Sequence, residues 1–227
     1  MRVLLITDRH VMAAQHGDFA SALRAALPPY RAHSWRDQVV LLLRDKDASE
    51  AERAELLTIA CNAVPAEVPI MVSSFVPAGI SAADHARIAG LHAPEAVPLN
   101  TVQRDVAAWQ RPALVGCSRH NTAGVMSAAY EGARYVQYGP VWPTPSKAGM
   151  GEPLGVAGLL ATRAALTAAG ATCSLVAVGG ITDGARASQA VTAGADAVAV
   201  IRAVWASPAP ADQLAHLLHS MAAARAT

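Results

Sequence analysis

Short apolar runs recur along this sequence, and most are apolar at consecutive positions instead of alternating with polar ones. Consecutive apolar residues are typical of strands that are buried on both faces of a parallel sheet. The predicted strands cover residues 3–7, 39–43, 69–72, 113–118, 134–139, 174–181 and 197–201, with a weaker one at 90–92.

Segments rich in alanine and leucine, each of helical length, lie between these strands. The helices that we predict from them include residues 49–63, 81–88, 121–132, 156–169 and 182–193. Ser49 with Glu52 three residues later is a capping box, and Gly194 is placed as a C-terminal stop. Alternating strands and helices indicate βαβ units and a parallel sheet. Eight such units predict an α/β, single-domain (β/α)8 TIM barrel over residues 1–227, rather than a doubly wound sheet.

Composition and charge narrow the classes of function. Hydrophobic residues make up 53% of the chain, and 18 basic against 17 acidic side chains leave a net charge of +1. No segment gathers Lys or Arg into a phosphate-binding patch, which argues against nucleic acid as a partner. The apolar run before Asp8 is too short for a signal peptide or a membrane span, so we expect no membrane association and a cytoplasmic location.

The cysteines do not indicate a metal or redox site. Cys61, Cys117 and Cys173 are widely spaced and form no CxxC pair, so we interpret them as reduced thiols. Cys117 stands beside polar residues at a strand end, but we interpret it as a small buried residue because its neighbours Ser118 and His120 point to the other side. We predict no metal site from these residues.

Polar residues follow most of the predicted strands, and in a parallel barrel the carboxyl ends of all strands face one common mouth, where catalysis takes place. They are Arg44, Lys46, Ser73, Ser74, His92, Glu95, Ser118, His120, Gly179, Gly180 and Arg202, together with the loop after the sixth strand. This distribution predicts a functional site at the mouth.

A Gly-Gly pair directly after an apolar strand exposes backbone N–H groups that can hold a phosphate. Gly179 and Gly180 form such a pair, and the strand that ends near Ile201 breaks into a short helical turn at Arg202. Barrels often build a phosphate site from the loops after strands seven and eight. The pattern therefore predicts a phosphate site, although a tight turn alone explains the two glycines equally well.

Two further positions have two readings each. Arg44 and Lys46 alternate with Asp45, so both cations can point to one side and bind a polyanion together, or they can form a solvated strand end paired with Asp45 and Asp47. His120 is either a general acid or base, because imidazole titrates near neutrality, or a cap for the helix that begins near Asn121.

Several motifs, taken in order, resemble the thiamin phosphate synthase and TenI superfamily. They are RDKD at 44–47, GCSRH at 116–120, GPVWPTPSK at 139–147, PLGVAGL at 153–159, AVGGI at 177–181 and AGADAVAVIRAV at 193–204. The resemblance implies a (β/α)8 barrel that acts in thiamin biosynthesis on a small-molecule phosphorylated thiazole. It also implies that Gly179, Gly180, Ile201 and Arg202 hold the phosphate of that substrate.

The superfamily contains synthases that join a pyrimidine diphosphate to the thiazole phosphate with the help of Mg²⁺. In GPVWPTPSK, Thr144, Ser146 and Lys147 match synthase positions that contact the diphosphate, and Ser118 matches a serine near the pyrimidine. Other positions depart from the synthase pattern: Leu42 replaces a glutamine, Ser73-Ser74 replaces Asn-Asp, and Glu95 is the acid after the fourth strand. Hydroxyls are poor Mg²⁺ ligands, which weakens the synthase reading.

The TenI branch instead resembles a metal-independent thiazole tautomerase. That tautomerase has a histidine after its fifth strand, and His120 matches this position. We therefore predict a TenI-like thiazole phosphate tautomerase without cofactors, with His120, Ser118 and Lys147 as catalytic residues and Arg44, Lys46, Thr144 and Ser146 as binding residues. The first alternative is a thiamin phosphate synthase, which would need Mg²⁺. The second is a non-catalytic barrel that binds thiazole or thiamin phosphate. A homo-oligomer is compatible with the sequence.

Overall fold

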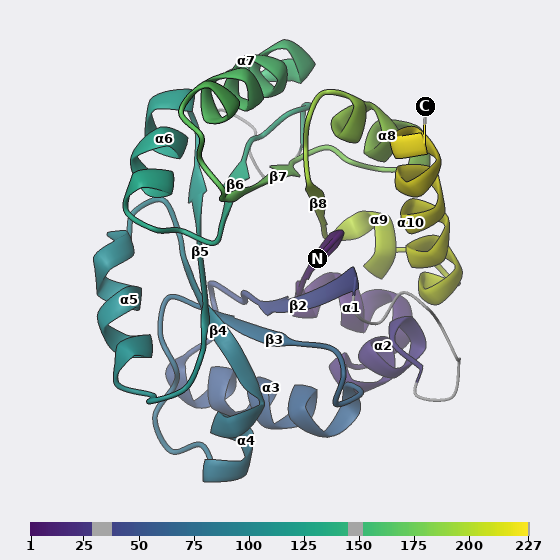
Figure 1. The fold of residues 1–227 in the computed structure, drawn as a ribbon. Coiled ribbons are helices and arrows are strands. Elements are labelled where there is room, and N and C mark those ends of the chain that lie inside the picture. The colour runs from purple at the N-terminus through teal and green to yellow at the C-terminus, as the bar shows by residue number, and fades with distance from the viewer. Residues whose placement is uncertain (29–37, 145–151, 227) are drawn as a thin grey trace.

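The protein was analysed as a computed structural model that describes residues 1–28, 38–144 and 152–226. Eight parallel strands pair in sequence order into a closed barrel (Figure 1), as predicted. Val3 on the first strand pairs with Val39 on the second and with Val198 on the last, which closes the ring. The strands are β1 Val3–Ile6, β2 Val39–Leu43, β3 Ile70–Ser73, β4 Ile88–Ala93, β5 Leu114–Arg119, β6 Tyr135–Tyr138, β7 Ser174–Val178 and β8 Ala197–Val200.

Helices form the outer ring around these strands (Figure 1). They are α1 Arg9–His16, α2 Phe19–Ala26, α3 Glu50–Ala63, α4 Ala82–Arg87, α5 Leu99–Ala107, α6 Thr122–Tyr130, α7 Gly155–Ala168, α8 Gly184–Thr192, α9 Arg202–Trp205 and α10 Pro210–Ala226. The predicted capping box of α3 is present, since Ser49 Oγ accepts a hydrogen bond from Glu52 N and Glu52 Oε2 accepts one from Ser49 N. None of the helices in the described ranges is both long and apolar enough to cross a membrane.

Two strand boundaries differ from the prediction for local reasons. The weak strand is longer than expected, because β4 begins at Ile88, which we had placed in the preceding helix. Its glycine, Gly90, lowers the strand signal in the sequence, yet a side chain there would collide with the backbone of Leu114 on β5. The strand predicted to reach residue 181 ends at Val178, because Gly179 and Gly180 adopt positive φ angles.

The apolar residues form two separate layers. One fills the space between the strands and the helices, and the other fills the lumen of the barrel. The lumen layer consists of Leu4, Ile6, Val40, Leu42, Met71, Tyr135, Val176, Ala197 and Ala199. Because neighbouring side chains on a strand point to opposite faces, both layers require apolar residues, which explains the consecutive apolar runs in the sequence.

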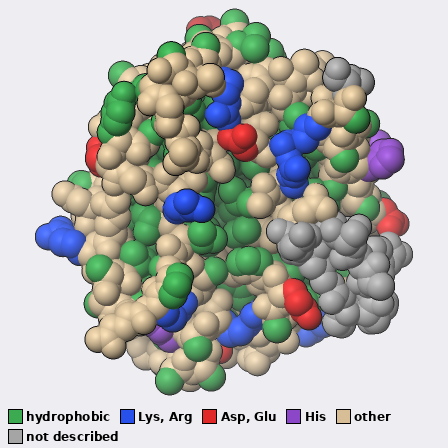
Figure 2. Space-filling view, viewed as in Figure 1, with side chains coloured by type: hydrophobic (Ala, Val, Ile, Leu, Met, Phe, Trp, Pro, Cys, Tyr) green, Lys and Arg blue, Asp and Glu red, His purple; other side chains and the backbone are tan. Residues whose placement is uncertain are grey.

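Charged side chains are dispersed over the face shown in Figure 2. Hydrophobic side chains are visible in its middle, and the Lys and Arg residues of the described ranges stand apart from one another around them (Figure 2). The face therefore carries no concentrated basic patch among its described residues.

Candidate functional site

A cavity of about 540 Å³ opens at the carboxyl ends of the strands. Its lining comes from all strands but β3 and includes Ile6, Asp8, Arg44, Lys46, Glu95, Ser118, His120, Gln137, Thr144, Val178, Gly179, Gly180, Ala199, Ile201 and Arg202. Ser73 and Ser74, which the sequence placed at the mouth, are not among its lining residues. The strands that carry these residues all point the same way, so their carboxyl ends converge on this mouth. The structure therefore brings together nearly all the residues that the sequence placed at the mouth. Ser146 and Lys147 lie outside the described residues, and their roles stay predictions.

The first side of the cavity carries Arg44 and Lys46, which follow β2. Burial lowers the pKa of Arg44, an effect that the negative charge of Asp45 partly offsets. Asp45 itself accepts hydrogen bonds from the Thr7 hydroxyl at 2.7 Å and from the backbone N–H of Arg9 at 2.8 Å. Its carboxylate thus anchors the start of α1, while the two cations that flank it line the cavity.

Asp47 is also engaged away from the two cations. Its carboxylate bonds Arg9 Nη1 and His10 Nε2, each at 2.8 Å, on an exposed surface. These bonds, that to His10 first, lower the pKa of Asp47 to about 2. The interpretation that Arg44 and Lys46 bind an anion stays a prediction, which their place in the lining of the cavity supports.

The other side of the cavity is the turn after β7. Gly179 and Gly180 have φ angles of 96° and 68°, a region that only glycine enters without strain. A side chain would also find no room, since a Cβ on Gly179 would lie 2.6 Å from Pro140 Cβ and one on Gly180 would lie 2.6 Å from Trp142 Cβ. Both glycines are therefore needed to let residues 140–142 pack against the turn.

The carbonyl groups of this turn point toward the loop that follows β6. Val141 N donates to the carbonyl of Val178 at 2.9 Å, Trp142 N donates to that of Gly179 at 3.1 Å, and Arg186 donates to that of Gly180. Within the described ranges, no backbone carbonyl accepts a hydrogen bond from the N–H of Gly180. The exposed Arg202, at the start of α9, lines the same cavity as this turn. The turn is thus both tight and suited to an anion.

His120 lies at the mouth and does not cap α6. Asn121 is the cap, because its Oδ1 accepts a hydrogen bond from Gly124 N at 2.7 Å, so the capping interpretation of His120 is wrong. The imidazole of His120 instead donates its Nδ1–H to the carbonyl of Gly139. Because a carbonyl oxygen only accepts, Nδ1 carries the hydrogen in this bond.

A chain of hydrogen bonds runs from the cavity into the lumen. Ser118 Oγ lies 2.9 Å from His92 Nε2, His92 Nδ1 lies 2.9 Å from Tyr135 Oη, and Tyr135 Oη donates to Met71 Sδ at 3.5 Å. The tautomer of neutral His92 sets the direction of these bonds: one ring nitrogen donates and the other accepts, and the hydroxyls of Tyr135 and Ser118 can take either role.

His92 is neutral in this setting. Its side chain is completely buried, and burial, followed by the positive charges of Arg44 and Arg119, lowers its pKa to about 3. Gly116 makes room for the arrangement, because a side chain there would collide with the ring of Tyr135. The orientation of Ser118 is therefore fixed by a buried group that stays uncharged, and its oxygen is available to accept a hydrogen bond from a ligand.

The sequence analysis placed His92 at the mouth but gave it no role, and it missed Tyr135 and Gln137 as parts of the site. His92 and Tyr135 lie in the lumen at positions that the alternation rule identifies, since they are spaced by two from other lumen residues on their strands. Their signal was hidden because each stands in a run that reads as an apolar strand. Cys117, in contrast, is fully buried outside the lumen, as predicted, and burial raises the pKa of its thiol to about 12.

The described residues contain no group of three or more His, Cys, Asp or Glu side chains placed to hold a metal ion. At the positions where the resemblance implies Mg²⁺ ligands, the chain offers the hydroxyls of Ser73 and Ser74 and the exposed carboxylate of Glu95. Hard Mg²⁺ favours several carboxylate oxygens in octahedral geometry. This donor set does not fit a Mg²⁺ site.

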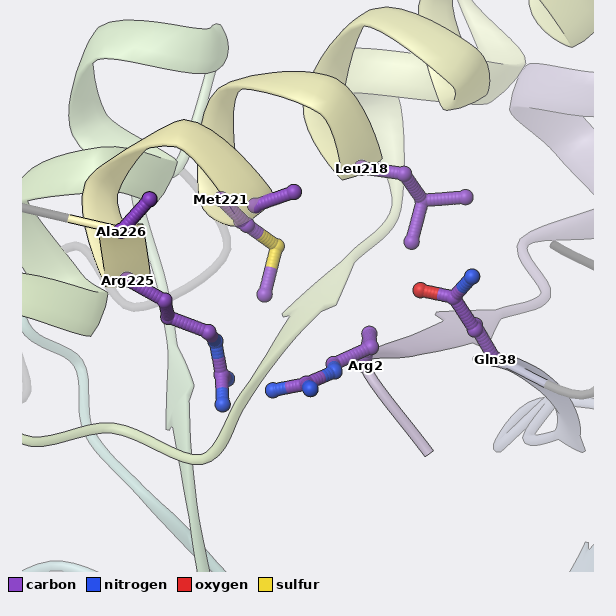
Figure 3. Close-up of a pocket in the computed structure, with 7 residues that line it drawn as sticks. Arg2, Gln38, Leu218, Met221, Arg225 and Ala226 are labelled. Atoms are coloured by element: carbon purple, nitrogen blue, oxygen red, sulfur yellow. The ribbon is translucent and has the colours of Figure 1, made fainter.

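A second, smaller cavity of about 270 Å³ lies at the opposite end of the barrel, between the start of β1 and α10 (Figure 3). Arg2 and Gln38 stand on one side of it, and Leu218, Met221 and Arg225 stand on the other (Figure 3). Arg225 already donates to the carbonyl of Asp196, and the peptide of Arg2 bonds both neighbouring strands. The two arginines therefore have structural roles at the closed end of the barrel.

Comparisons with known proteins agree with the motifs. Residues 3–204 match the family model described as thiamine monophosphate synthase. A thiamine-phosphate synthase of Mycobacterium marinum is 32% identical over 229 residues, covering 98% of this chain and 96% of that protein. Putative thiamine-phosphate synthase of Geobacter sulfurreducens is 40% identical over 105 residues, which is 46% of each chain, so this match spans about half the length of that relative.

The solved structures show the same architecture. Thiamine phosphate pyrophosphorylase from Pyrococcus furiosus superposes with a TM-score of 0.73, covering 98% of this chain and 96% of that chain. Its sequence identity is 20%, so the likeness concerns the fold. The solved structure and the strand topology thus agree on the barrel fold.

Proposed function

The chain belongs to the thiamine monophosphate synthase family, and we propose that it joins a pyrimidine diphosphate to a thiazole phosphate with release of pyrophosphate. This reaction was the first alternative from the sequence, where the tautomerase was preferred. The names of the family and of the full-length relative favour the synthase. The cavity gives a physical reason to reverse the order of the two hypotheses.

The observation that carries the proposal is the presence of two anion-binding groups at one cavity. Arg44 and Lys46 follow β2, whereas the turn of Gly179 and Gly180 follows β7, and Arg202 follows β8. In the barrel β1 lies between β2 and β8, so one strand separates the two groups. A synthase must hold one diphosphate and one phosphate at the same time, whereas a tautomerase of a carboxythiazole phosphate holds one phosphate and one carboxylate, which is a smaller total charge.

Between the two groups the cavity has an apolar floor. Ile6, Val178 and Ala199 line it, and two of them belong to the lumen layer. Flat aromatic rings can lie on this floor while their charged groups reach the two sides. Holding both rings in one orientation supplies a large part of the rate enhancement, because the encounter of two reactants becomes a step within one complex.

The bond changes of the proposed reaction need a leaving group to be stabilised. The ring nitrogen of the thiazole supplies the electron pair of the new C–N bond, and pyrophosphate leaves with the pair of the broken C–O bond. Negative charge grows on the departing diphosphate, and Arg44 and Lys46 are placed to stabilise it. Since the residues present do not fit Mg²⁺, the protein's own contribution is assigned to these cations.

Ser118 and His92 act in binding rather than in bond formation. Ser118 bonds His92 and keeps a lone pair on its oxygen, which can accept a hydrogen bond from a donor on the ligand, such as an aromatic amine. His92 stays neutral and holds the hydroxyl in this orientation. Ser118 is therefore a substrate-binding residue and His92 a positioning residue.

The tautomerase remains the second candidate, because one observation favours it. His120 lies at the mouth with its Nδ1 bonded to the carbonyl of Gly139, and proton transfer on a thiazole requires a base such as imidazole and no metal. The same barrel would then use the turn of Gly179 and Gly180 for the single phosphate.

The test is a direct assay of both reactions with the purified protein. We expect thiamin phosphate and pyrophosphate to form from the two substrates, and Arg44→Met to lower kcat/KM about 10²- to 10³-fold. Arg104→Met is the matched control, because Arg104 is an exposed arginine on α5, outside the cavity, and it should retain wild-type kcat/KM.

Each other outcome rejects the proposal in favour of a stated alternative. Aromatisation of a carboxythiazole phosphate, lost in His120→Ala, without any thiamin phosphate, would identify the tautomerase. Tight binding of thiazole phosphate by calorimetry without turnover in either assay would identify a non-catalytic binding protein.

A further inference from the structure

Gln137 is a buried polar residue of the cavity that the reaction described above does not use. Its side chain is 3% exposed, and it lines the cavity from β6. Among the described residues, its Nε2 is the buried side-chain nitrogen or oxygen that finds no hydrogen-bond partner. A buried amide nitrogen without an acceptor destabilises a fold, and native proteins keep such groups mainly where function needs them.

The strand register places this amide next to Ser118. Gln137 pairs with Ser118 on β5 and with Val176 on β7, and it follows Tyr135 by two positions, so both side chains point into the lumen. Tyr135 lies deeper and is satisfied by His92 and Met71. Gln137 is thus the polar residue one layer above the hydrogen-bond chain of Ser118, His92 and Tyr135, at the floor of the cavity.

The hydrogen-bonding characters of the two neighbours are complementary. The hydroxyl of Ser118 carries two lone pairs, so its oxygen can accept a hydrogen bond from the cavity while it bonds His92. Gln137 carries two N–H donors on its terminal amide, and a half-turn of the amide exchanges its oxygen and nitrogen without moving the rest of the side chain. The floor therefore offers one acceptor and one donor side by side.

We propose that Gln137 donates a hydrogen bond to a ring nitrogen of the pyrimidine substrate. The oxygen of Ser118 accepts a hydrogen bond from the amino group next to that nitrogen. The matching ligand edge is an aromatic nitrogen adjacent to an amino group, as in an aminopyrimidine. Gln137 is then the residue that selects and orients this ring. The inference rests on the proposed function. It extends that function by naming the residue of the same site that recognises the pyrimidine ring.

The phosphate groups are not suitable partners for Gln137. Charged groups are met at the sides of the cavity by Arg44, Lys46 and the glycine turn, whereas Gln137 lies at the floor among apolar residues such as Val178. A dianion placed there would lose its hydration and gain one neutral donor. A neutral ring nitrogen loses little hydration and satisfies the amide.

The experiment compares Gln137→Leu with the wild-type protein. Leucine has a similar size and no polar atom, so removal of the unpaired amide should raise the melting temperature of the ligand-free protein by roughly 2–4 °C. The same change should raise KM for the pyrimidine diphosphate about tenfold and leave KM for the thiazole phosphate unchanged. By calorimetry, inorganic diphosphate should bind both proteins equally, whereas the aminopyrimidine diphosphate should bind the variant about tenfold more weakly.

Gln103→Leu is the matched control, because the amide of Gln103 on α5 already donates to the carbonyl of Glu131 at 2.7 Å. This variant should not gain thermal stability and should keep both KM values. A Gln137→Leu protein that melts at a lower temperature and keeps its KM for the pyrimidine would show that Gln137 is structural, and would overturn the proposal.

Failure of this inference can be told apart from failure of the proposed function. If the wild-type protein makes thiamin phosphate and Gln137→Leu has an unchanged KM for the pyrimidine, the inference is wrong and the function stands. If the wild-type protein makes no thiamin phosphate, yet binds the aminopyrimidine diphosphate and loses affinity in Gln137→Leu, the reaction is wrong and the recognition site stands.

Discussion

The burial of His92 makes the stability of this protein depend on pH in a predictable way. The pKa of His92 is about 3 in the folded state, against an ordinary value of about 6.5 in an unfolded chain. Between these two values the unfolded state binds a proton that the folded state does not bind. Stability is therefore complete above about pH 6.5 and is lost progressively as the pH falls toward 3.

The size of the effect follows from the same two pKa values. At about pH 5 the histidine of the unfolded chain is almost fully protonated, and this protonation lowers the free energy of the unfolded state by about 2 kcal/mol relative to pH 7.5. The free energy of the folded state changes by almost nothing, because His92 stays neutral there. The free energy of unfolding should thus fall by about 2 kcal/mol through this one residue. With a urea m-value of about 2 kcal/mol/M, the unfolding midpoint shifts by roughly 1 M.

The assay is urea unfolding, followed by fluorescence, of wild type and His92→Asn at both pH values. Other titrating groups contribute equally to both proteins, so the difference in pH dependence belongs to His92 even if the variant is less stable overall. His85→Asn is the control, because His85 is partly exposed against Trp109, and this variant should keep the wild-type dependence. If His92→Asn loses as much stability as wild type between the two pH values, His92 is not a buried neutral histidine and the reasoning is refuted.

Two further predictions concern the glycine turn and the buried thiol. In urea titrations, Gly180→Ala should reduce the free energy of unfolding by about 1–3 kcal/mol more than Gly79→Ala. Both glycines have positive φ, but only Gly180 is crowded by neighbouring atoms, whereas Gly79 has open space around it. Equal losses would show that the packing of the loop against the turn is unimportant. Cys117 should resist alkylation in the folded protein at about pH 8, since its thiol is buried and its pKa is raised to about 12. Rapid labelling of Cys117 in the folded protein, detected by peptide mapping, would contradict this prediction.

The fold could be predicted from the sequence because its signals are local. Each strand is a run of apolar residues that must serve two hydrophobic layers, and each helix has recognisable ends, such as the box formed by Ser49 and Glu52. The exception was β4, where Gly90 weakens the apolar pattern. The reason for that glycine is the close approach of Leu114 on the next strand, which is a tertiary contact that local sequence does not reveal.

The outline of the site was also predictable, because it follows from topology. Once the strands were known to be parallel, the residues after their carboxyl ends had to meet, and Arg44, His120 and Gly179 do line one cavity. What the sequence did not reveal is which polar groups satisfy one another across the lumen. His92 and Tyr135 are 43 positions apart, and only the closed barrel brings their side chains to 2.9 Å.

The orphan amide of Gln137 was hidden for the same reason. A glutamine within an apolar strand reads as an edge or surface residue until the structure shows that its side chain has no partner. Buried polar groups are thus the residues that sequence reasoning assigns least well. In this barrel they are also the residues that define the floor of the site.

The hydrogen-bond chain that begins at Ser118 ends at the thioether of Met71. A thioether sulfur accepts weakly, carries no proton and cannot pass one onward. A proton that entered the chain at the cavity would therefore have no exit toward the closed end of the barrel. The chain orients hydrogens without conducting them, so any proton exchanged during the reaction must enter and leave through the mouth, by way of solvent or His120.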